Sequence, residues 1–475
     1  MKEIKRRMET FSFYDRTGTE RHLEEMAEQG WLLEKIGPFF WTYRKIEPQR
    51  LAFSVCYFPK ASQFDPEPSE EQQTFYDFCE HSGWVLAASN AQLQVFCNER
   101  ENPVPIETDP VLEVESIHQT MKRSFLPSQL MLLAVAVLDV GLLVWRLIDD
   151  PIGLLVSPAS VLTAMCWVLL FVLTGVELGG YFWWHRKAAQ AAERGEFLDS
   201  RSHRKLQIGA LVLMGLGVVY YMLSVALSES RMMMAVAVLM FCVYIPGLFL
   251  LVRGVMGWLK RKKVPAKVNR AVTIISALVV AYLFVGAITF GVLFGSSHGW
   301  FAEQDEETYQ HNGITFTAAQ DQLPLTVEDL LDVDYEGYSR EHRGSESLFL
   351  AQYQGYQRPR FDAERYKEMP QLEYTVTVVK APFLYGLCRE HLLLDRAERW
   401  NRDMPESDWY FYEPTDPAPW GAQEAYRWTH QEYGPRGTYL LCYSDRFVEV
   451  KFSQKWEVTP AQMAVVGETL GRGEF

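Results

Sequence analysis

Five apolar stretches divide the chain and decide its structural class. They cover roughly residues 128–148, 160–183, 206–227, 232–252 and 271–294, and each is rich in Leu, Val, Ala, Met and Phe. A helix needs about 20 apolar residues to cross the roughly 30 Å hydrocarbon core of a bilayer, where its backbone must satisfy its own hydrogen bonds. Strands in a protein core are much shorter than these stretches. The pattern therefore predicts a multi-pass α-helical membrane protein with five transmembrane helices.

The basic residues between these stretches predict how the chain is threaded. Lys and Arg gather before the first stretch, between the second and third, and between the fourth and fifth. The connections at residues 149–153 and 228–231 are almost free of them. Because Lys and Arg are retained on the cytoplasmic side of the cell membrane, we expect the N-terminus in the cytoplasm and the C-terminus outside.

Charge and composition then separate three regions. The chain has 475 residues and a net charge of −14, and its acidic residues concentrate at the two ends. We expect a cytoplasmic α+β domain at 1–126, the transmembrane domain at 127–295 and an extracytoplasmic α+β domain at 296–475. The acidic balance argues against nucleic acid as a partner, because nucleic acid requires a basic face.

Residues 1–126 contain one pattern twice. A short amphipathic helix ends at Gly30 and is followed by Trp31. The same order of helix, glycine and tryptophan recurs 53 residues later, at Gly83 and Trp84. Glycine provides the left-handed cap that ends a helix, and tryptophan is expected to anchor the next strand in the core. We interpret these four residues as the structural anchors of an internal repeat. With an alternating strand at 51–58 between the copies, the pattern predicts one ferredoxin-like sheet with two helices on one face.

This region also resembles a known family. The residues that carry the resemblance are the opening Phe11, Ser12, Phe13, Tyr14 and Asp15, the helix end at 26–31, and the second Gly83–Trp84 pair. Together they resemble the bacterial family called domain of unknown function 2812, over roughly residues 8–100. The resemblance implies a cytoplasmic module joined to several transmembrane helices and, in many members, an outer domain that ends in a strand and a helix. It implies no chemistry, because no activity is established for that family.

Residues 296–475 mix strand and helix patterns. Alternating β-branched and aromatic residues predict strands at 371–379, 438–443 and 446–452, with a hairpin turn at Ser444 and Asp445. Helices are expected at 383–402 and 459–471. The aromatic and proline-rich segment 409–428 is interpreted as an ordered loop over the sheet, either a packed surface or a binding platform. Cys388 and Cys442 lie where a disulfide could persist, and the sequence leaves open whether they are bridged.

Motifs for catalysis and cofactors are missing from the sequence. There is no phosphate-binding glycine loop, dinucleotide fingerprint, HExxH or GxSxG motif, and no His pairs with Cys at metal-ligand spacing. We therefore predict that the protein is not an enzyme and has no catalytic residues, cofactor or metal.

Two acidic residues within the apolar stretches are the candidate functional positions. Asp139 lies near the middle of the first stretch, and Glu177 lies toward the cytoplasmic end of the second. Since a charge within the bilayer is costly, each should face a partner or water. The residues could line a pathway in a transporter or channel component, or they could hold helices together. Folded domains on both faces favour a signalling or accessory protein, and a transporter or channel component is the alternative. Its cytoplasmic domain would bind a protein, its helices would contact membrane lipid, and its outer domain would meet a ligand that the sequence does not specify.

Overall fold

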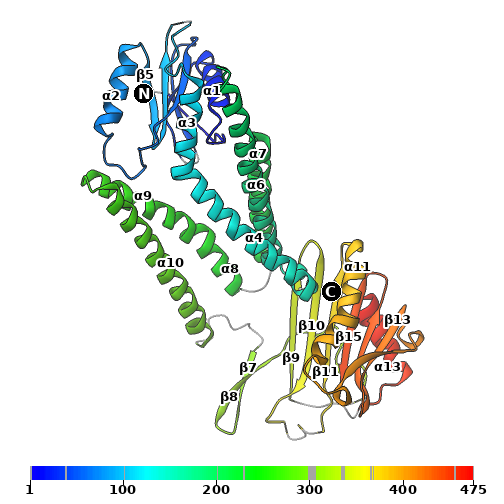
Figure 1. The fold of residues 1–475 in the computed structure, drawn as a ribbon. Coiled ribbons are helices and arrows are strands. Elements are labelled where there is room, and N and C mark those ends of the chain that lie inside the picture. The colour runs from blue at the N-terminus through cyan, green and yellow to red at the C-terminus, as the bar shows by residue number, and fades with distance from the viewer. Residues whose placement is uncertain are drawn as a thin grey trace. The chain divides into compact units, whose positions relative to one another are not determined.

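The computed structural model describes residues 3–37, 40–100, 102–200, 202–227, 231–297, 306–332, 337–363, 366, 368–453 and 456–473 (Figure 1). Contacts within the chain divide it into two units. The first comprises Met1–Val140, Met165–Val219 and Met232–Leu293, and the second comprises Gly141–Ala164, Tyr220–Arg231 and Phe294–Phe475. Each unit is described by itself.

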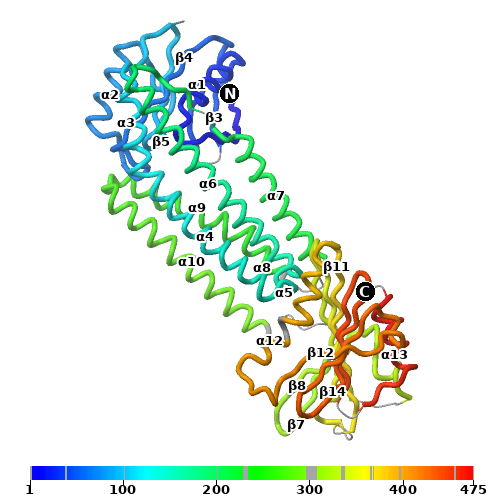
Figure 2. Tube along the Cα trace, turned by 45° about the vertical axis from the view of Figure 1, so that its right-hand side comes forward, coloured from blue at the N-terminus to red at the C-terminus, as the bar shows by residue number. Residues whose placement is uncertain are grey.

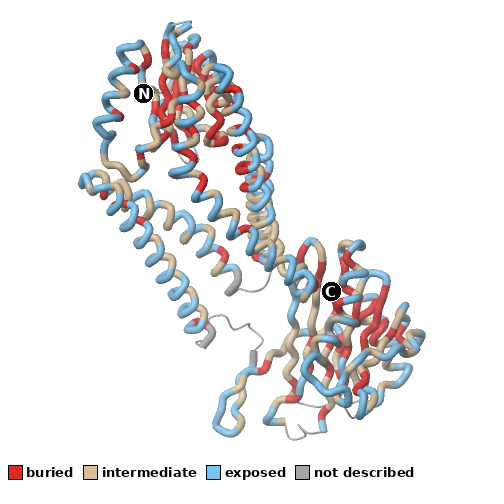
Figure 3. The backbone as a smooth tube through the Cα atoms, in the orientation of Figure 1, coloured by how far each residue is buried: buried red, intermediate tan, exposed pale blue. Residues whose placement is uncertain are grey.

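Among the described residues, five helices are long and apolar enough to cross a membrane, which fits a multi-pass membrane protein, and α+β domains lie at both ends of the chain. Only 6–11% of each apolar window is buried within the protein, which suits side chains that face lipid (Figure 3). The helices are continuous over Pro110–Asp149, Pro158–Ala192, Arg204–Leu227, Met234–Arg261 and Ala266–Gly295. Their elements are α3 (Pro110–Thr120), η1 (Met121–Phe125), α4 (Leu126–Asp149), α6 (Pro158–Ala192), α7 (Arg204–Leu227), α8 (Arg231–Val238), η2 (Leu239–Tyr244), α9 (Ile245–Arg261) and α10 (Ala266–Ser297).

Two of these helices contain π-helical segments, and each segment ends just before a proline. The segment η1 precedes Pro127, and η2 precedes Pro246. Proline lacks the N–H that an α-helix uses, and its ring collides with the carbonyl four residues earlier. The wider π turn accommodates the proline while the helix continues.

The N-terminal domain contains two three-stranded antiparallel sheets, so the prediction of one ferredoxin-like sheet was wrong. The first half of the domain comprises β1 (Ile4–Arg7), α1 (Arg16–Glu28), β2 (Trp31–Lys35) and β3 (Trp41–Lys45). The second half comprises β4 (Ala52–Tyr57), α2 (Glu70–His81), β5 (Val85–Asn90) and β6 (Leu93–Asn98). The sheet orders are β1-β3-β2 and β4-β6-β5. Each half closes its own sheet because its first strand pairs with its own last strand.

The two halves share local geometry at matching positions. Gly30 and Gly83 both follow a helix with positive φ, at 83° and 88°. Each hairpin also carries a register shift, between Leu33 and Lys35 in the first and between Leu86 and Ala88 in the second. The two shifts have the same 53-residue offset as the glycines. The halves therefore agree in strand order, in helix termination and in the place of the bulge.

The core of the N-terminal domain extends into the second long helix. Leu178, Tyr181 and Trp184 of α6 are buried in the same apolar cluster as Leu23 of α1 and Tyr43 of β3. A separate small cluster holds Cys79, Trp84 and Phe96. The domain therefore completes its core only when α6 packs against it.

The C-terminal domain is built on a seven-stranded antiparallel sheet, in the order β12-β13-β14-β15-β11-β10-β9. Its strands are β9 (Tyr338–Glu346), β10 (Leu350–Pro359), β11 (Leu372–Val379), β12 (Tyr410–Thr415), β13 (Glu424–His430), β14 (Gly434–Cys442) and β15 (Arg446–Phe452). A separate hairpin joins β7 (Glu306–His311) and β8 (Ile314–Ala319). The predicted strands at 371–379 and 446–452 are present, and segment 409–428 is not a loop because it supplies β12 and begins β13.

Alternating side chains give this sheet a core on each face. Leu441, Val448 and Val450 pack with Val466 and Leu470 of α13 (Pro460–Arg472). Leu440, Cys442 and Phe447 pack on the other face. They contact Cys388 of α11 (Tyr385–Glu390) and Ile152 of α5 (Pro151–Val156).

The predicted helix at 383–402 is present as one unbroken helical run over residues 382–401 with a 3₁₀ start and a π-helical segment. It consists of η3 (Pro382–Leu384), α11, η4 (His391–Asp395) and α12 (Arg396–Asn401). Cys388 and Cys442 are both free thiols in the same cluster, and burial raises their pKa values to about 11 and about 12.

Candidate functional site

The two acidic residues named from the sequence lie in different settings. Asp139 of α4 is half-buried, and no hydrogen bond or ion pair to its carboxylate is found among the described residues. Glu177 of α6 is only 9% exposed and has polar partners from two other parts of the chain. The structure does not bring the two carboxylates together, since each lies on its own helix with its own surroundings.

Glu177 joins the N-terminal domain to two long helices. The hydroxyl of Ser12, in the segment between β1 and α1, donates a 2.8 Å hydrogen bond to its Oε1. The side-chain amide of Gln207, in the first turn of α7, donates to the same oxygen. Figure 2 shows α6 and α7 running beside each other from this domain. Ser12 also contacts the loop before α7, since its backbone N–H donates to Ser202 Oγ at 3.2 Å.

A second carboxylate, that of Glu9, is buried two residues before the segment 11–15 that carries the family resemblance. Its side chain is 0% exposed. Arg204, the first residue of α7, places its guanidinium 2.8 Å from Oε2. His22 Nε2 of α1 lies 2.9 Å from Oε1, and Arg7 Nε lies 3.3 Å from the same atom. Tyr43 of β3 donates a longer hydrogen bond of 3.4 Å. One carboxylate therefore links three elements of the domain to the start of α7.

Electrostatics keeps Glu9 ionised. Burial by itself would raise the pKa of this carboxyl, but the His22 hydrogen bond and the positive charges of Arg7 and Arg204 outweigh burial and hold the pKa below its usual value. Burial, reinforced by the neighbouring Glu9 charge, raises the pKa of Tyr43. The arrangement therefore favours a carboxylate anion held by cationic partners and a neutral phenol.

A third polar link lies at the start of α1. Asp15 caps this helix by accepting a 3.0 Å hydrogen bond from the Gly18 N–H. The same oxygen, Oδ1, accepts a 3.0 Å hydrogen bond from Ser200 Oγ in the α6–α7 loop. Ser200 Oγ also accepts from the Thr17 backbone N–H at 3.2 Å. The helix cap is thus shared with the loop, because one carboxylate oxygen serves both.

Aromatic packing fills the space between these polar links. Tyr14 is 1% exposed, and its ring centroid lies 5.7 Å from that of Tyr181 and 5.5 Å from that of Trp184, both on α6. Phe11 lies beneath the Arg204 guanidinium at 5.1 Å, and Phe13 stacks on Phe125 at 5.7 Å. Burial, reinforced by the Glu177 charge, raises the pKa of Tyr14 to about 12. We call this assembly of residues 8–15, 177–184 and 199–207 the junction.

The junction is suited to attachment rather than to catalysis. Its carboxylates are occupied by partners inside the protein, and its aromatic rings close the spaces between them. Across the part of the chain that the structure describes, no three His, Cys, Asp or Glu side chains converge as a metal ion would require. Glu177 Oε2 and Gln207 Oε1 are buried without a hydrogen-bond partner, so one side of this contact is not fully satisfied.

Comparison with known proteins finds a family that is similar to part of the N-terminal region. Residues 15–129 match the family described as "Protein of unknown function (DUF2812)". The N-terminal region of this chain is therefore similar to that family. Searches of curated proteins and of solved structures found no match to the chain.

The DUF2812 match begins at the shared helix cap and ends within the first long helix. Its first residue is Asp15, and its last, residue 129, lies in α4. The match therefore includes α3 and the start of a membrane span, beyond the resemblance seen at residues 8–100. Of the residues that carried that resemblance, Phe11, Ser12, Tyr14 and Asp15 all contact α6, α7 or the loop between them.

The four repeat anchors occupy unequal positions in the DUF2812 domain. Trp84 is 3% exposed, and its indole N–H donates to the Val104 carbonyl at 2.9 Å. Trp31 is half-buried at the edge of the main core, with Lys5 Nζ 5.0 Å above its ring. Gly30 and Gly83 are the helix-ending glycines with positive φ described above.

Sequence reasoning missed Glu9 and its partners. Glu9 and Arg204 are 195 residues apart, and both look like ordinary surface residues in a polar stretch. No local signal identifies this set: His22 lies beside the apolar Leu23, but Ser200 and Arg204 lie in a polar connection between two apolar stretches.

Proposed function

We propose that this protein is a signalling or accessory membrane protein, without enzymatic activity, that relays a conformational state between its outer domain and its DUF2812 domain. The observation that carries the proposal is the junction. It fixes residues 8–15 of the domain to both α6 and α7 through two buried carboxylates, so that a shift of one helix against the other must disturb the domain. A flexible linker would not transmit such a shift.

The relay requires a defined threading of the chain. We propose that the DUF2812 domain lies in the cytoplasm and that residues 296–475 lie outside the cell membrane, with a protein partner on the cytoplasmic side and a ligand outside. The distribution of Lys and Arg supports this orientation.

Accessibility of introduced cysteines tests this threading. The native Cys388 and Cys442 are 0% and 1% exposed and would not react with a reagent in solution. Single cysteines at exposed positions, Glu99→Cys and Gln431→Cys, should differ instead. A membrane-impermeant maleimide applied to intact cells should label the second variant beyond the wild-type background but not the first. Labelling of Glu99→Cys alone would reverse the orientation.

We further propose that the DUF2812 domain arose by duplication of one βαββ unit. The shared strand order, the two glycines with positive φ and the two bulges at the same offset support this. A domain made of two similar units offers two related surfaces, which suits binding of a protein partner.

The contacts of Glu177 favour relay over transport. A residue that lines an ion pathway needs access to water, whereas Glu177 is 9% exposed and bonded to Ser12 and Gln207. Its role in the junction therefore accounts for an acidic residue within an apolar helix without a pathway.

The relay can be tested in the intact protein in lipid nanodiscs. An antibody fragment raised against residues 306–475 supplies the outer perturbation, and amide hydrogen exchange of residues 8–45 supplies the readout. We expect binding to change exchange in this segment at least two-fold in the wild type. In Glu9→Gln the change should disappear, because the link to Arg204 is lost, while in the surface control Glu3→Gln it should persist. If binding of the antibody fragment left amide exchange of residues 8–45 unchanged in the wild type, the relay would be refuted.

A further inference from the structure

A cavity lies between the DUF2812 domain and α9. It has a volume of about 710 Å³ and is lined by the segment 61–68, by the ends of β2 and β5, and by one face of α9. This volume lies within the range of about 300–1,000 Å³ that is typical of small-molecule sites. Both walls belong to the same unit of the structure.

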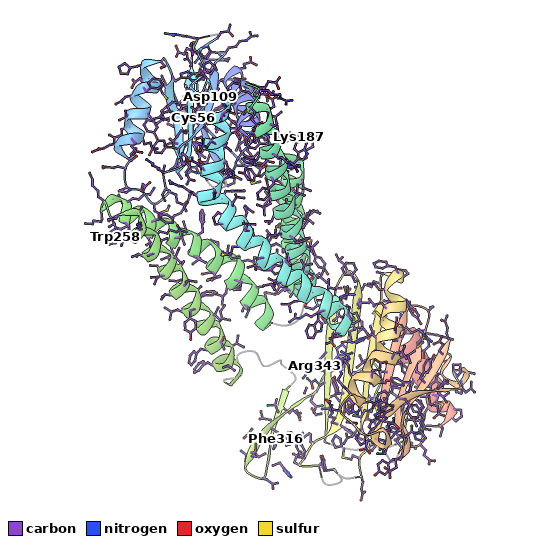
Figure 4. The ribbon with its side chains drawn as sticks, viewed as in Figure 1. Cys56, Asp109, Lys187, Trp258, Phe316 and Arg343 are labelled. Carbon is purple, nitrogen blue, oxygen red and sulfur yellow. The ribbon has the colours of Figure 1, made fainter. Side chains whose placement is uncertain are left out.

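One wall of this cavity is formed by α9 and carries both apolar and basic side chains. Phe249, Val252 and Met256 line it from α9, and Arg253 and Lys260 line it from the same helix. Spacings of three, four, seven and eleven residues from Phe249 place all five on one helical face. Trp258 lies near the same basic end of α9 (Figure 4). Apolar and cationic side chains therefore share this helical face, with Arg253 between Val252 and Met256 and with Lys260 one turn beyond Met256.

The positive charges in the cavity lack ion-pair partners. Lys35 adds a third cation from the domain side, and within the described residues none of Lys35, Arg253 and Lys260 has a carboxylate within ion-pair distance. The cavity also contains two carboxylates. Glu67 pairs with Lys263 at 2.8 Å, and Asp65 accepts a 2.6 Å hydrogen bond from the Ser62 N–H. The Asp65 charge also attracts Lys260 without forming an ion pair with it.

Arg253 is the residue that most needs a partner. It lies eight residues before the end of α9, about 12 Å along the axis at 1.5 Å per residue, and so within the apolar helix. Its guanidinium lies over the Phe249 ring at 4.8 Å, which holds the charge at the cavity wall without neutralising it. An unpaired charge at this depth is costly, so an anion from the membrane itself would relieve it.

The wall formed by residues 61–68 is held in place. Asn269 of α10 is fully buried and donates to the Phe64 carbonyl at 3.2 Å and to the Met256 carbonyl at 3.3 Å. This amide joins the loop to α9. The Thr273 hydroxyl donates a 3.2 Å hydrogen bond to the side-chain oxygen of Asn269, Oδ1. The cavity is therefore a built feature, bounded by a hydrogen-bonded loop rather than by a free one.

We propose that this cavity binds an acidic phospholipid, with the phosphate between Arg253, Lys260 and Lys35 and the first carbons of an acyl chain against Val252 and Met256. Basic pockets beside the ends of transmembrane helices are the places where such headgroups bind. The same phosphate chemistry could come from a soluble phosphate ester, but the apolar side chains of the wall favour a phosphate that carries an acyl chain. The inference does not depend on the relay proposed above.

Native mass spectrometry of the full-length protein in detergent tests this site. The probes are a phosphatidylglycerol and a phosphatidylcholine with identical chains. We expect the wild type to retain phosphatidylglycerol at least ten-fold better, and the double variant Arg253→Gln with Lys260→Gln to lose at least ten-fold of that retention. The matched control, Arg261→Gln with Lys262→Gln, removes the same charge at exposed positions outside the cavity and should change retention less than two-fold. Equal losses in both double variants would overturn the site, because they would reflect surface charge alone.

Two further measurements keep the proposal testable if the double variant does not fold. Lys35→Gln changes an exposed residue of β2 and should still lower phosphatidylglycerol retention several-fold. Glycerol phosphate, added at the same concentration as the lipid, should not displace it. Unchanged retention in Lys35→Gln would overturn the headgroup site, and full displacement by glycerol phosphate would assign the cavity to a soluble ester instead of a lipid.

Discussion

Replacing Glu9 with glutamine is the most direct perturbation of the junction. Glutamine keeps the size of the side chain and one oxygen acceptor, but it removes the negative charge that Arg204, Arg7 and His22 share. Three cationic or hydrogen-bonding partners then converge on a neutral amide that is itself buried. The change should therefore loosen the attachment of the DUF2812 domain to α7 without removing any packing volume.

The magnitude follows from the burial of each partner. Hydrogen bonds to charged groups contribute about 1.5–3 kcal/mol each, and the bond to His22, which is 9% exposed at its side chain, should count fully. Arg204 and Arg7 are 34% and 37% exposed, so water compensates much of their loss. We expect a total cost of about 2–3 kcal/mol, which corresponds to a fall of about 30- to 150-fold in protection of the local amides.

Hydrogen exchange of the intact protein measures this local cost without assuming that the whole chain unfolds in one step. Peptides that cover residues 8–28 should lose protection in Glu9→Gln, while peptides from β9–β11 of the outer domain should not change. The control Glu3→Gln breaks an exposed pair with Lys45, so protection should stay within two-fold. If Glu9→Gln matched this control, the junction would contribute nothing that holds the domain in place.

The effect must also depend on pH in one direction. The folded-state pKa of Glu9 lies below its ordinary value of 4.5. Its stabilising contribution is therefore complete above pH 4.5 and is lost as the pH falls through the lower folded-state pKa. The difference in protection between wild type and Glu9→Gln should shrink below pH 4.5. A difference that grew on acidification would mean that Glu9 is not held as an anion.

Four other substitutions test separate parts of the DUF2812 domain and its contact with α6. Burial raises the pKa of Glu20 to about 7, so ionisation of this residue destabilises the folded domain as pH rises from 4.5 to about 7. Glu20→Gln should therefore stabilise it at pH 8 by up to about 3 kcal/mol and flatten the melting temperature over that interval, and an unchanged pH profile would contradict this. Trp84→Ala should lower the free energy of unfolding by about 3–5 kcal/mol. Trp31→Ala should lower it by less than half as much, because its ring is only half-buried. Equal falls in melting temperature would be inconsistent with the structure. Gly180→Ala would place a Cβ 2.8 Å from the Tyr14 hydroxyl and should raise amide exchange in residues 11–15 without changing any charge, whereas unchanged exchange would mean that Tyr14 can move aside.

The membrane helices could be predicted because their signal is local. Each apolar stretch satisfies its own backbone, so length and composition within about 20 residues are enough to recognise it. The structure extends the helices beyond the predicted stretches, to Pro110 at the start of the first and to Arg261 at the end of the fourth, because polar residues continue the helix outside the apolar region.

The junction could not be predicted because its signal is distributed. Ser12 and Glu177 are 165 residues apart, and Glu9 and Arg204 are 195 residues apart. Neither member of a pair differs from a solvated residue until the fold brings the two together. Glu177 was recognisable as a charge within an apolar stretch, and its position indicated that a partner must exist without indicating which.

In the C-terminal domain, the sequence pattern predicted the central strands of the sheet but not the edge strand β12. β11 and β15 have buried residues on both faces and alternate clearly, whereas β12 lies at the edge and carries Pro414. Proline and mixed aromatic residues are tolerated at an edge strand because one side of its backbone is unpaired. That tolerance removes the alternation on which strand prediction depends, which explains why segment 409–428 was interpreted as a loop.

The polar character of the junction is itself informative about its role. Apolar packing between the DUF2812 domain and α6, as Tyr14 makes with Trp184, would be enough to hold the two together, and a buried ion pair adds little net stability over an apolar contact. What a buried carboxylate adds is orientation, because its partners must return to within hydrogen-bond distance or leave a charge unpaired. Glu9 imposes this condition on α7 through Arg204, and Glu177 imposes it on α6 through Ser12. The proposed relay would require both conditions to be met or broken together, because that coupling would give the two-state behaviour on which a relay depends.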